Sequence, residues 1–269
     1  MANFLTSLKG GFSGWAAPVI GRDRELVNYG GFVSGRAGKQ RTFGDSNTVE
    51  FFDDFLGDLI KDEWNYVEGT DSATSSAAIL AGGIGGQLRI TTGDAGTGLA
   101  ADMAQLTHDV SQWQASNGGL AIEGRFKLSA ISICYCFFGF TDVGMLEAPI
   151  ESAASANTLT SNATDAVGFM FDTRMTDDNW WLVGVADDVD ATHEDTGSAP
   201  VADTFATFRV EINSTGVATF YYNGANVGSA MTGAVTAAND LTPTFAVSKT
   251  SVAASMTAEI DYIHVSMNR

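Results

Sequence analysis

The chain contains one dense group of carboxylates. Asp187, Asp188, Asp190, Glu194 and Asp195 fall within nine residues. Several carboxylates in one loop are able to hold a calcium ion, which takes oxygen ligands. Their spacing does not match an EF-hand loop, so a solvated acidic loop is the alternative. We predict no resident cofactor and no metal, and we keep Asp187, Asp188 and Asp190 as the candidates for a calcium site.

Other familiar catalytic arrangements are missing from the sequence. The three histidines, His108, His193 and His264, are too far apart for the close pairs that a zinc site usually shows. The sequence contains neither a G-x-S-x-G nucleophile elbow nor a P-loop. We therefore predict no catalytic residue.

Two short patterns predict how side chains point from a strand. Trp180 and Trp181 are adjacent, so one should point into the core and the other outward. We expect the outward indole in a subunit interface, and a platform for a glycan is the alternative. Cys134 and Cys136 should share one face and cannot easily bond each other. We expect buried free thiols.

The first 48 residues differ from the rest in charge and pattern. Residues 1–41 hold six basic and two acidic side chains, a net charge of +4, whereas the whole chain has −18. Glycines recur every few residues and disfavour a helix. We predict an extended, glycine-rich arm over residues 1–48, and packing of its aromatic rings on the chain's own body is the alternative. The predicted partner-binding residues are Trp15, Arg22, Arg24, Phe32, Arg36, Lys39 and Arg41.

The strong negative charge limits the partners of the body. It repels nucleic acid phosphates and anionic lipid, so we expect neither nucleic acid nor a membrane as partner. The sequence has no apolar run long enough to span a bilayer and no signal peptide pattern at its start.

Residues 49–269 show the pattern of many short strands. The segment 119–131 alternates apolar and charged residues, and 133–142 is apolar on both faces, as expected of a central strand. Asn223-Gly224 predicts a tight hairpin turn because both residues tolerate positive φ. Further strands are expected at 49–55, 87–93, 167–174, 179–187, 204–213, 242–249 and 256–267. An antiparallel two-sheet sandwich accommodates this pattern.

The body resembles the concanavalin A-like lectin/glucanase jelly roll, including its laminin-G-like branch. The resemblance rests on FFDDFLGDLIKDEW (51–64), FRVEINSTGVATFYYNGANVG (208–228) and AEIDYIHV (258–265). It implies an all-β jelly-roll sandwich over residues 49–269. In the family's hydrolases the catalytic pair lies on one strand as Glu-x-Asp-x-x-Glu. Glu259 and Asp261 match only the first half, since Ile263 and His264 stand where the second Glu would fall. We expect an outward polar face there.

The layout of a basic arm ahead of a jelly roll resembles tailed-phage capsid decoration (cement) proteins. This resemblance implies a structural virion protein on the capsid exterior, made in the host cytoplasm and not an enzyme. The implied partners are the major capsid protein or another shell protein, and further copies of the chain in a homotrimer. Two alternatives remain open. One is a lectin-like, glycan-binding adhesion module. The other is a glycoside hydrolase with a displaced carboxylate pair, which needs two carboxyls within roughly 10 Å in a cleft.

Overall fold

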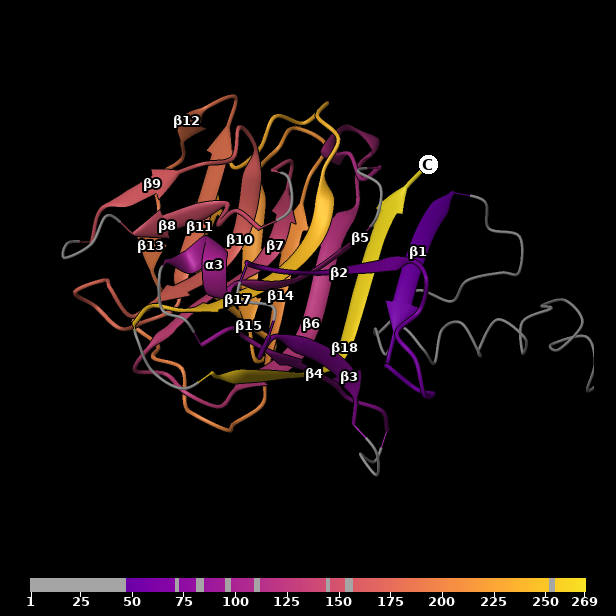
Figure 1. Cartoon of the computed structure of the whole chain (residues 1–269). Helices are drawn as coiled ribbons and strands as arrows, with labels where there is room; N and C mark the ends of the chain where they lie inside the picture. Colours follow the sequence, from indigo (N-terminus) through magenta and orange to yellow (C-terminus); the bar gives the residue numbers. More distant parts are fainter. Residues whose placement is uncertain are drawn as a thin grey trace, which may run out of the picture. The chain divides into compact units, whose positions relative to one another are not determined.

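A computed structural model describes most of the body of the chain. The described residues are 47–70, 73–80, 85–94, 98–108, 112–143, 146–152, 157–251 and 255–269. The compact unit considered below spans residues 49–268. It consists of two large sheets packed face to face, with a small two-stranded sheet outside them (Figure 1).

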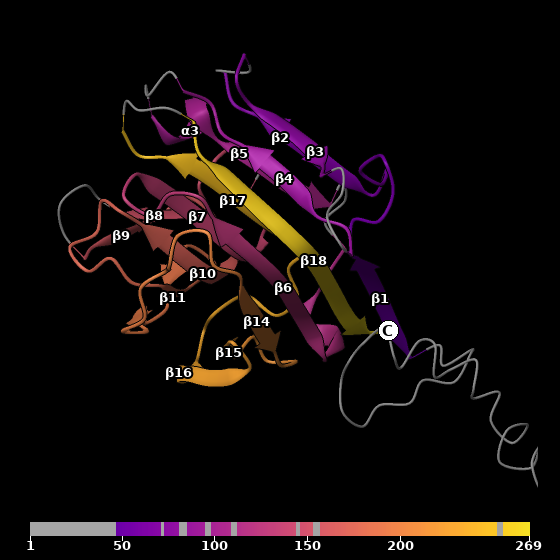
Figure 2. The same cartoon turned by 90° about the horizontal axis from the view of Figure 1, so that it is seen from below.

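Sheet A has eight strands, with β6 and β18 at its centre. Its order is β16 (Ala225–Met231), β15 (Ala218–Tyr222), β14 (Ala206–Ile212), β6 (Leu120–Leu128), β18 (Thr257–Asn268), β4 (Leu88–Thr91) and β3 (Ser76–Ile79). β1 (Thr48–Asp53) also pairs with β18. Figure 2 shows β1 and β4 beside the same long strand. The long alternating segment 119–131 therefore forms a central strand, which its length and pattern favour.

Sheet B also has eight strands. Its order is β12 (Val189–Asp190), β11 (Trp181–Ala186), β10 (Ala166–Asp172), β7 (Cys134–Thr141), β17 (Thr242–Lys249), β5 (Ala104–His108) and β2 (Trp64–Glu68), and β13 (Glu194–Asp195) pairs with β11. Every residue of β7, β10 and β17 is buried. Such continuous burial requires cover on both faces of the sheet.

The core between the sheets is built from aromatic rings. Phe126 of sheet A stacks on Phe208 at 4.3 Å between ring centroids. It also meets Phe245 of sheet B edge-on at 4.9 Å. Burying each such ring contributes about 1.5–3 kcal/mol to folding. The predicted all-β, antiparallel jelly-roll sandwich is confirmed by this arrangement.

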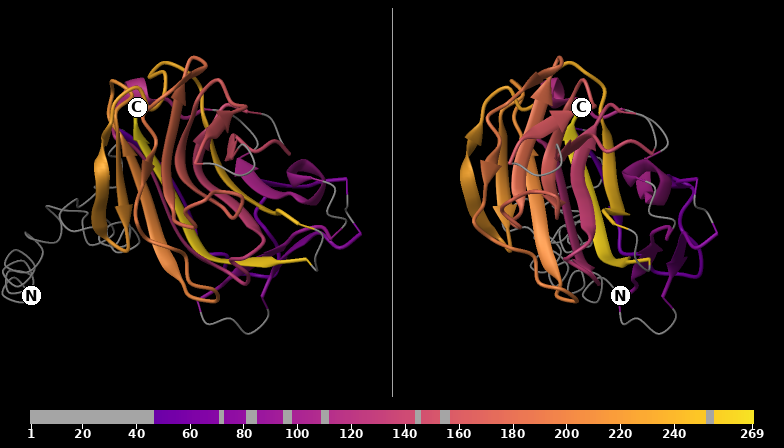
Figure 3. Two further views of the ribbon diagram at one scale, coloured as in Figure 1. Left: turned by 90° about the vertical axis from the view of Figure 1, so that its left-hand side faces the viewer. Right: turned by 60° about the vertical axis from the view of Figure 1, so that its left-hand side comes forward.

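A third layer covers the outer face of sheet B. It consists of the short helix α3 (Leu99–Asp102) and the hairpin of β8 (Ile150–Ser152) and β9 (Leu159–Ser161) (Figure 3). The Tyr135 hydroxyl of β7 donates a hydrogen bond to the Ile150 carbonyl at 2.9 Å. Apolar side chains of the layer pack on the outward residues of sheet B, which form a second core cluster. The third layer therefore shields the outward side chains of sheet B from solvent.

Candidate functional site

A pocket of about 550 Å³ lies between α3 and the β8–β9 hairpin. Its volume falls within the range of about 300–1,000 Å³ typical of ligand sites. Two carboxylates, Glu147 and Glu151, border it together with the Asn162 amide. The remaining lining residues are Thr70, Gly98, Leu99, Ala100, Ala101, Leu146 and Ala148. The pocket therefore brings two acidic groups to one small, largely apolar space.

Glu151 is held by donors on both of its oxygens. The Arg174 Nη2 group donates to Oε2 at 3.0 Å. The Asn162 Nδ2 group donates to Oε1 at 3.3 Å and to the Ala148 carbonyl at 2.9 Å. These two donors hold the Glu151 side chain in one orientation at the wall of the pocket.

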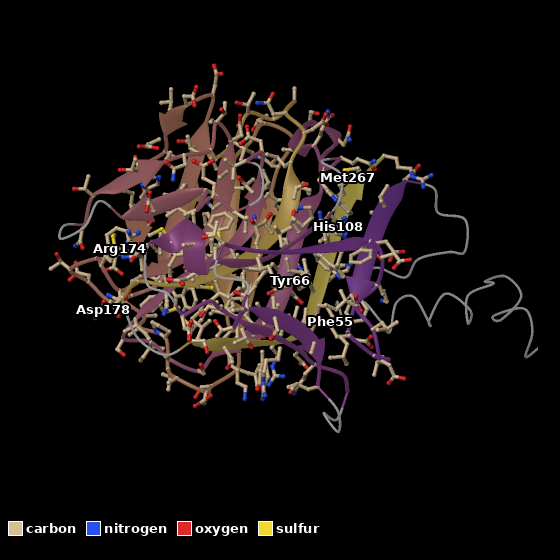
Figure 4. The ribbon with its side chains drawn as sticks, viewed as in Figure 1. Phe55, Tyr66, His108, Arg174, Asp178 and Met267 are labelled. Atoms are coloured by element: carbon tan, nitrogen blue, oxygen red, sulfur yellow. The ribbon has the colours of Figure 1, made fainter. Side chains whose placement is uncertain are left out.

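Arg174 is itself fixed by Asp172, the last residue of β10. The guanidinium donates from Nη2 to Asp172 Oδ2 at 2.6 Å, and from Nε to both oxygens at 3.0 and 3.1 Å. The Asp172 side chain is fully buried. Burial alone would lower the pKa of Arg174, but its bonds to Asp172 and Glu151 raise that pKa. Figure 4 shows Arg174 on the side of the body that carries the β8–β9 hairpin.

The two carboxylates that share Arg174 lie close to each other. Glu151 and Asp172 both bond its Nη2, at 3.0 and 2.6 Å. Because both bonds end on the same nitrogen, the two bonded oxygens are at most about 5.6 Å apart (3.0 + 2.6 Å). The buried Asp172 carboxylate holds the Arg174 guanidinium in place. Glu147 is exposed and makes no hydrogen bond or ion pair with the described residues.

The pocket residues could not be found from a motif. Glu147 and Glu151 lie in a segment without strand periodicity, and Asp172 and Arg174 follow about 20 residues later. Only folding of the hairpin over sheet B brings them together. The one signal in the sequence is Asp172 followed by Arg174 at the end of the apolar segment 166–171, because charged side chains beside buried residues usually need a partner.

The predicted calcium candidates do not converge on one point. Asp187 and Asp188 are exposed at a turn with positive φ between β11 and β12. Asp190 accepts a short hydrogen bond from Ser161. Across the part of the chain that the structure describes, no group of three or more His, Cys, Asp or Glu side chains is placed to hold a metal. The arm residues Trp15, Arg22, Arg24, Phe32, Arg36, Lys39 and Arg41 lie outside the described residues.

Glu259 and Asp261 lie on β18, on the outer face of sheet A, and each is bonded to basic side chains. Arg89 and Lys127 bond Glu259, at 2.5 and 2.8 Å. Arg125 bonds Asp261 at 2.6 Å. Burial works to raise the pKa of Glu259, but Lys127 and Arg89 hold it below its usual value. Both carboxylates thus belong to a ladder of ion pairs, the polar face that their alternation predicted.

The two tryptophans point to opposite faces of sheet B, yet neither is a surface platform. Trp180 packs in the core between the sheets and Trp181 in the outer cluster. Their exposed fractions are 2% and 8%. The expectation of an exposed indole is wrong because the third layer covers the outer face. Cys134 and Cys136 are buried free thiols on one face, as predicted.

Comparison with solved structures finds the same fold in proteins of low sequence identity. No family model matches the chain and no curated protein matches its sequence. A β-1,3-1,4-glucanase (lichenase) derived from a mouse hindgut metagenome matches with TM-score 0.53 and 10% identity, over 80% of this chain and 98% of that one. An endo-1,3-β-glucanase from Streptomyces sioyaensis gives 0.52 and 12%, over 85% and 100%. The kappa-carrageenase from Pseudoalteromonas carrageenovora gives 0.50 and 12%, over 87% and 100%.

These similarities correct the predicted function. The prediction of a capsid decoration protein, and the prediction that the chain is not an enzyme, are wrong on this comparison, because the structures reported above are two glucanases and a carrageenase. The prediction rested on the absence of a linear catalytic motif. Two carboxylates of one covering segment, Glu147 and Glu151, border the pocket. No helix among the described residues is long and apolar enough to cross a membrane.

Proposed function

We propose that this chain is a glycoside hydrolase whose active site is the pocket between α3 and the β8–β9 hairpin. The observation that carries the proposal is that two carboxylates, Glu147 and Glu151, line the same pocket. Arg174 and Asn162 donate hydrogen bonds to Glu151 and hold it in place. Glycosidases use two carboxyl groups that flank the scissile bond. The glucanase and carrageenase folds make a polysaccharide the natural substrate class.

The two carboxylates have different surroundings and so different roles. Glu151 is held in place by the Arg174 guanidinium, which suits a nucleophile or a general base. Glu147 is exposed and has no hydrogen-bond or ion-pair partner among the described residues, and we assign it the role of general acid. Asp172 acts through Arg174 and is a positioning residue. The Asn162 amide, fixed on the Ala148 carbonyl, completes the wall.

The proposed pair departs from the one-strand pattern of the family's hydrolases. On β10 the outward positions are Ala166, Gly168, Met170 and Asp172, so only one acid faces that side. The acids of the pocket come from the segment that covers the sheet. This departure favours a second candidate function, glycan binding without hydrolysis, because a displaced pair can hold sugar hydroxyls without flanking a glycosidic bond.

Polysaccharide hydrolysis by the purified chain separates the two functions. β-1,3-glucan, β-1,3-1,4-glucan and kappa-carrageenan are incubated with the protein and reducing ends are measured. Glu151→Gln and Glu147→Gln should each lower the rate by at least about 100-fold, the usual contribution of an acid–base group. Glu259→Gln, in the ion-pair ladder of sheet A, is the matched control and should leave the rate unchanged.

The remaining outcomes decide between the candidates. Binding of a polysaccharide without release of reducing ends supports the second function and ends the first. An active protein whose Glu147→Gln and Glu151→Gln variants keep full rates places the active site elsewhere. Neither binding nor hydrolysis of any of the three polymers contradicts both functions for these substrates.

A further inference from the structure

Two of the large apolar side chains that the described part of the chain leaves exposed lie in one loop. Leu56 and Leu59, between β1 and β2, are 61% and 82% exposed. A single exposed apolar residue is ordinary, but two within four positions form a small patch. The same loop carries four acids and one base, Asp54, Asp58, Asp62, Glu63 and Lys61. Residues 54–63, called the leucine loop below, therefore combine an apolar patch with negative charge.

The leucine loop is held at its base by the buried carboxylate of Asp53. This carboxylate accepts a hydrogen bond from the Phe55 N–H at 2.9 Å and another from the Trp64 indole N–H at 2.9 Å. Lys61 adds an ion pair with it at 2.8 Å. Groups from both ends of the loop are thus joined to one side chain. Because the loop is already fixed, its leucines lose little conformational freedom when they bind a partner.

A pocket of about 160 Å³ opens beside the start of β14, and we call it the aromatic pocket. The buried rings of Phe126, Trp180 and Phe208 line it, and Val201, which is 63% exposed, lies at its rim. None of its lining residues borders the acidic pocket. An apolar cavity of about 150 Å³ accommodates benzene, which has more carbon atoms than a leucine side chain. The aromatic pocket is therefore large enough for one leucine side chain.

Two basic side chains lie beside the aromatic pocket, against the ring of Phe205. The Arg125 guanidinium is 4.4 Å and the Lys127 ammonium 5.1 Å from the ring centroid. Only eight of the 14 basic residues of the chain lie beyond residue 41, where the net charge is −22. Each of the two cations also bonds one carboxylate of the ladder. The surroundings of Phe205 are thus close to neutral and repel an acidic loop less than the net charge implies.

The leucine loop and the aromatic pocket lie toward opposite edges of the sandwich. β2, which follows the loop, is at one end of sheet B, whereas Trp180 directly precedes β11 near the other end. β1 and β11 likewise lie on opposite sides of the body (Figure 1). Since Asp53 holds the loop at its base, the loop cannot reach the pocket of its own copy. A contact between the two joins separate copies through different surfaces.

We propose that copies of this chain associate head to tail, with Leu59 of one copy inserted in the aromatic pocket of the next. The pocket matches one leucine in size and chemistry, and the cations beside Phe205 match the acids of the loop. After a first contact each end keeps one unused surface, so association continues as a chain or closes as a ring. The contact is small and therefore weak. It is independent of the reaction at the acidic pocket.

Sedimentation velocity of the full chain from about 1 μM to about 1 mM measures this association. The average mass of the wild-type chain should rise with concentration. Leu59→Asp and Val201→Glu should each weaken association by at least about tenfold, because each places a charge at a contact that buries apolar surface. Val189→Glu is the matched control, since Val189 is 67% exposed and lies outside both surfaces. All three positions are exposed, so the fold should be retained.

An equal mixture of the two interface variants tests the head-to-tail geometry. Leu59→Asp keeps its pocket and Val201→Glu keeps its loop, so the mixture should form dimers and nothing larger. The proposal is overturned if the mixture forms no dimers, or if the wild-type chain stays monomeric up to about 1 mM. Association of Leu59→Asp at the wild-type level assigns the contact to another part of the chain. A loss in Val189→Glu as large as that in Val201→Glu shows a general effect of charge. Either result also overturns the proposal.

Discussion

Replacement of Arg174 by Met should be the most damaging change at the acidic pocket that removes no carboxylate. Arg174 gives Asp172 three side-chain contacts and Glu151 one. The Asp172 side chain is fully buried, and that of Arg174 is 25% exposed. Met keeps much of the apolar stem but removes the charge. Asp172 would keep the backbone N–H of residue 174, which donates at 2.9 Å.

The expected cost follows from leaving a buried anion without its cation. Removing one partner of a buried ion pair costs about 3–5 kcal/mol. The partial exposure of Arg174 lets water approach, and the remaining backbone donor offsets part of the loss, so we expect about 3 kcal/mol. For a body of this size that lowers the melting temperature by roughly 6–12 °C. Urea unfolding of the purified chain at pH 7 measures the same free energy.

Two variants show whether the charge is responsible. Asp172→Asn combined with Arg174→Met should recover about 1–2 kcal/mol, because the buried charge is gone from both sides. Arg89→Met, whose side chain is 46% exposed and bonds Glu259, should cost at most about 1 kcal/mol. The reasoning is refuted if Arg174→Met costs no more than Arg89→Met, or if the double variant is as unstable as Arg174→Met alone.

Three further changes test other parts of the body. Burial lowers the pKa of His108, so its contribution to stability should be fully present above its ordinary pKa of about 6.5 and fall as the pH drops below it. Urea unfolding at pH 7.5 and pH 5 should show a smaller loss of unfolding free energy in His108→Phe than in the wild-type chain. An equal loss in both proteins would contradict this prediction. Burial raises the pKa of Cys134 and Cys136, so a thiol reagent should label them only after denaturation, and rapid native labelling would contradict their burial. A Cβ on Gly139 would overlap the Val167 carbonyl, so Gly139→Ala should lower the unfolding free energy by about 1–3 kcal/mol, and an unchanged urea midpoint would refute the close approach.

The sequence predicted most of the sandwich because its central strands have strong patterns. β6 alternates, β7 and β10 are continuously apolar, and the Asn223-Gly224 turn has the positive φ values expected of it. Strands β2, β3 and β5 were not predicted. Ser76–Ile79 is small and weakly apolar, and Ala104–His108 has one large aliphatic residue. Pairing with a neighbouring strand, a long-range effect, decides their structure.

The third layer escaped prediction for a related reason. Alternation at the start of β11 correctly assigns Trp180 and the first strand residue, Trp181, to opposite faces. It does not say whether either face is covered. Whether the outer face meets solvent depends on another segment, and here the β8–β9 hairpin covers it through the Tyr135–Ile150 hydrogen bond. The covering segment shows no strand-like alternation of apolar and polar residues, because β8 and β9 are only three residues long each.

The proposed acids form no one-strand motif because they lie in this covering layer. A motif on one strand places two acids by local geometry alone, and Glu259 with Asp261 shows that such spacing also occurs in a plain ion-pair ladder. At the pocket, Glu151 and Asp172 are 21 positions apart in the sequence, and only their shared bond to Arg174 brings them together. The Arg174 guanidinium that bonds both acids therefore marks this pocket as clearly as the acids themselves. A buried anion at the end of an apolar strand needs a counter-charge, and Arg174, which supplies it to Asp172, also bonds Glu151 and so helps to hold the hairpin on the outer face of sheet B.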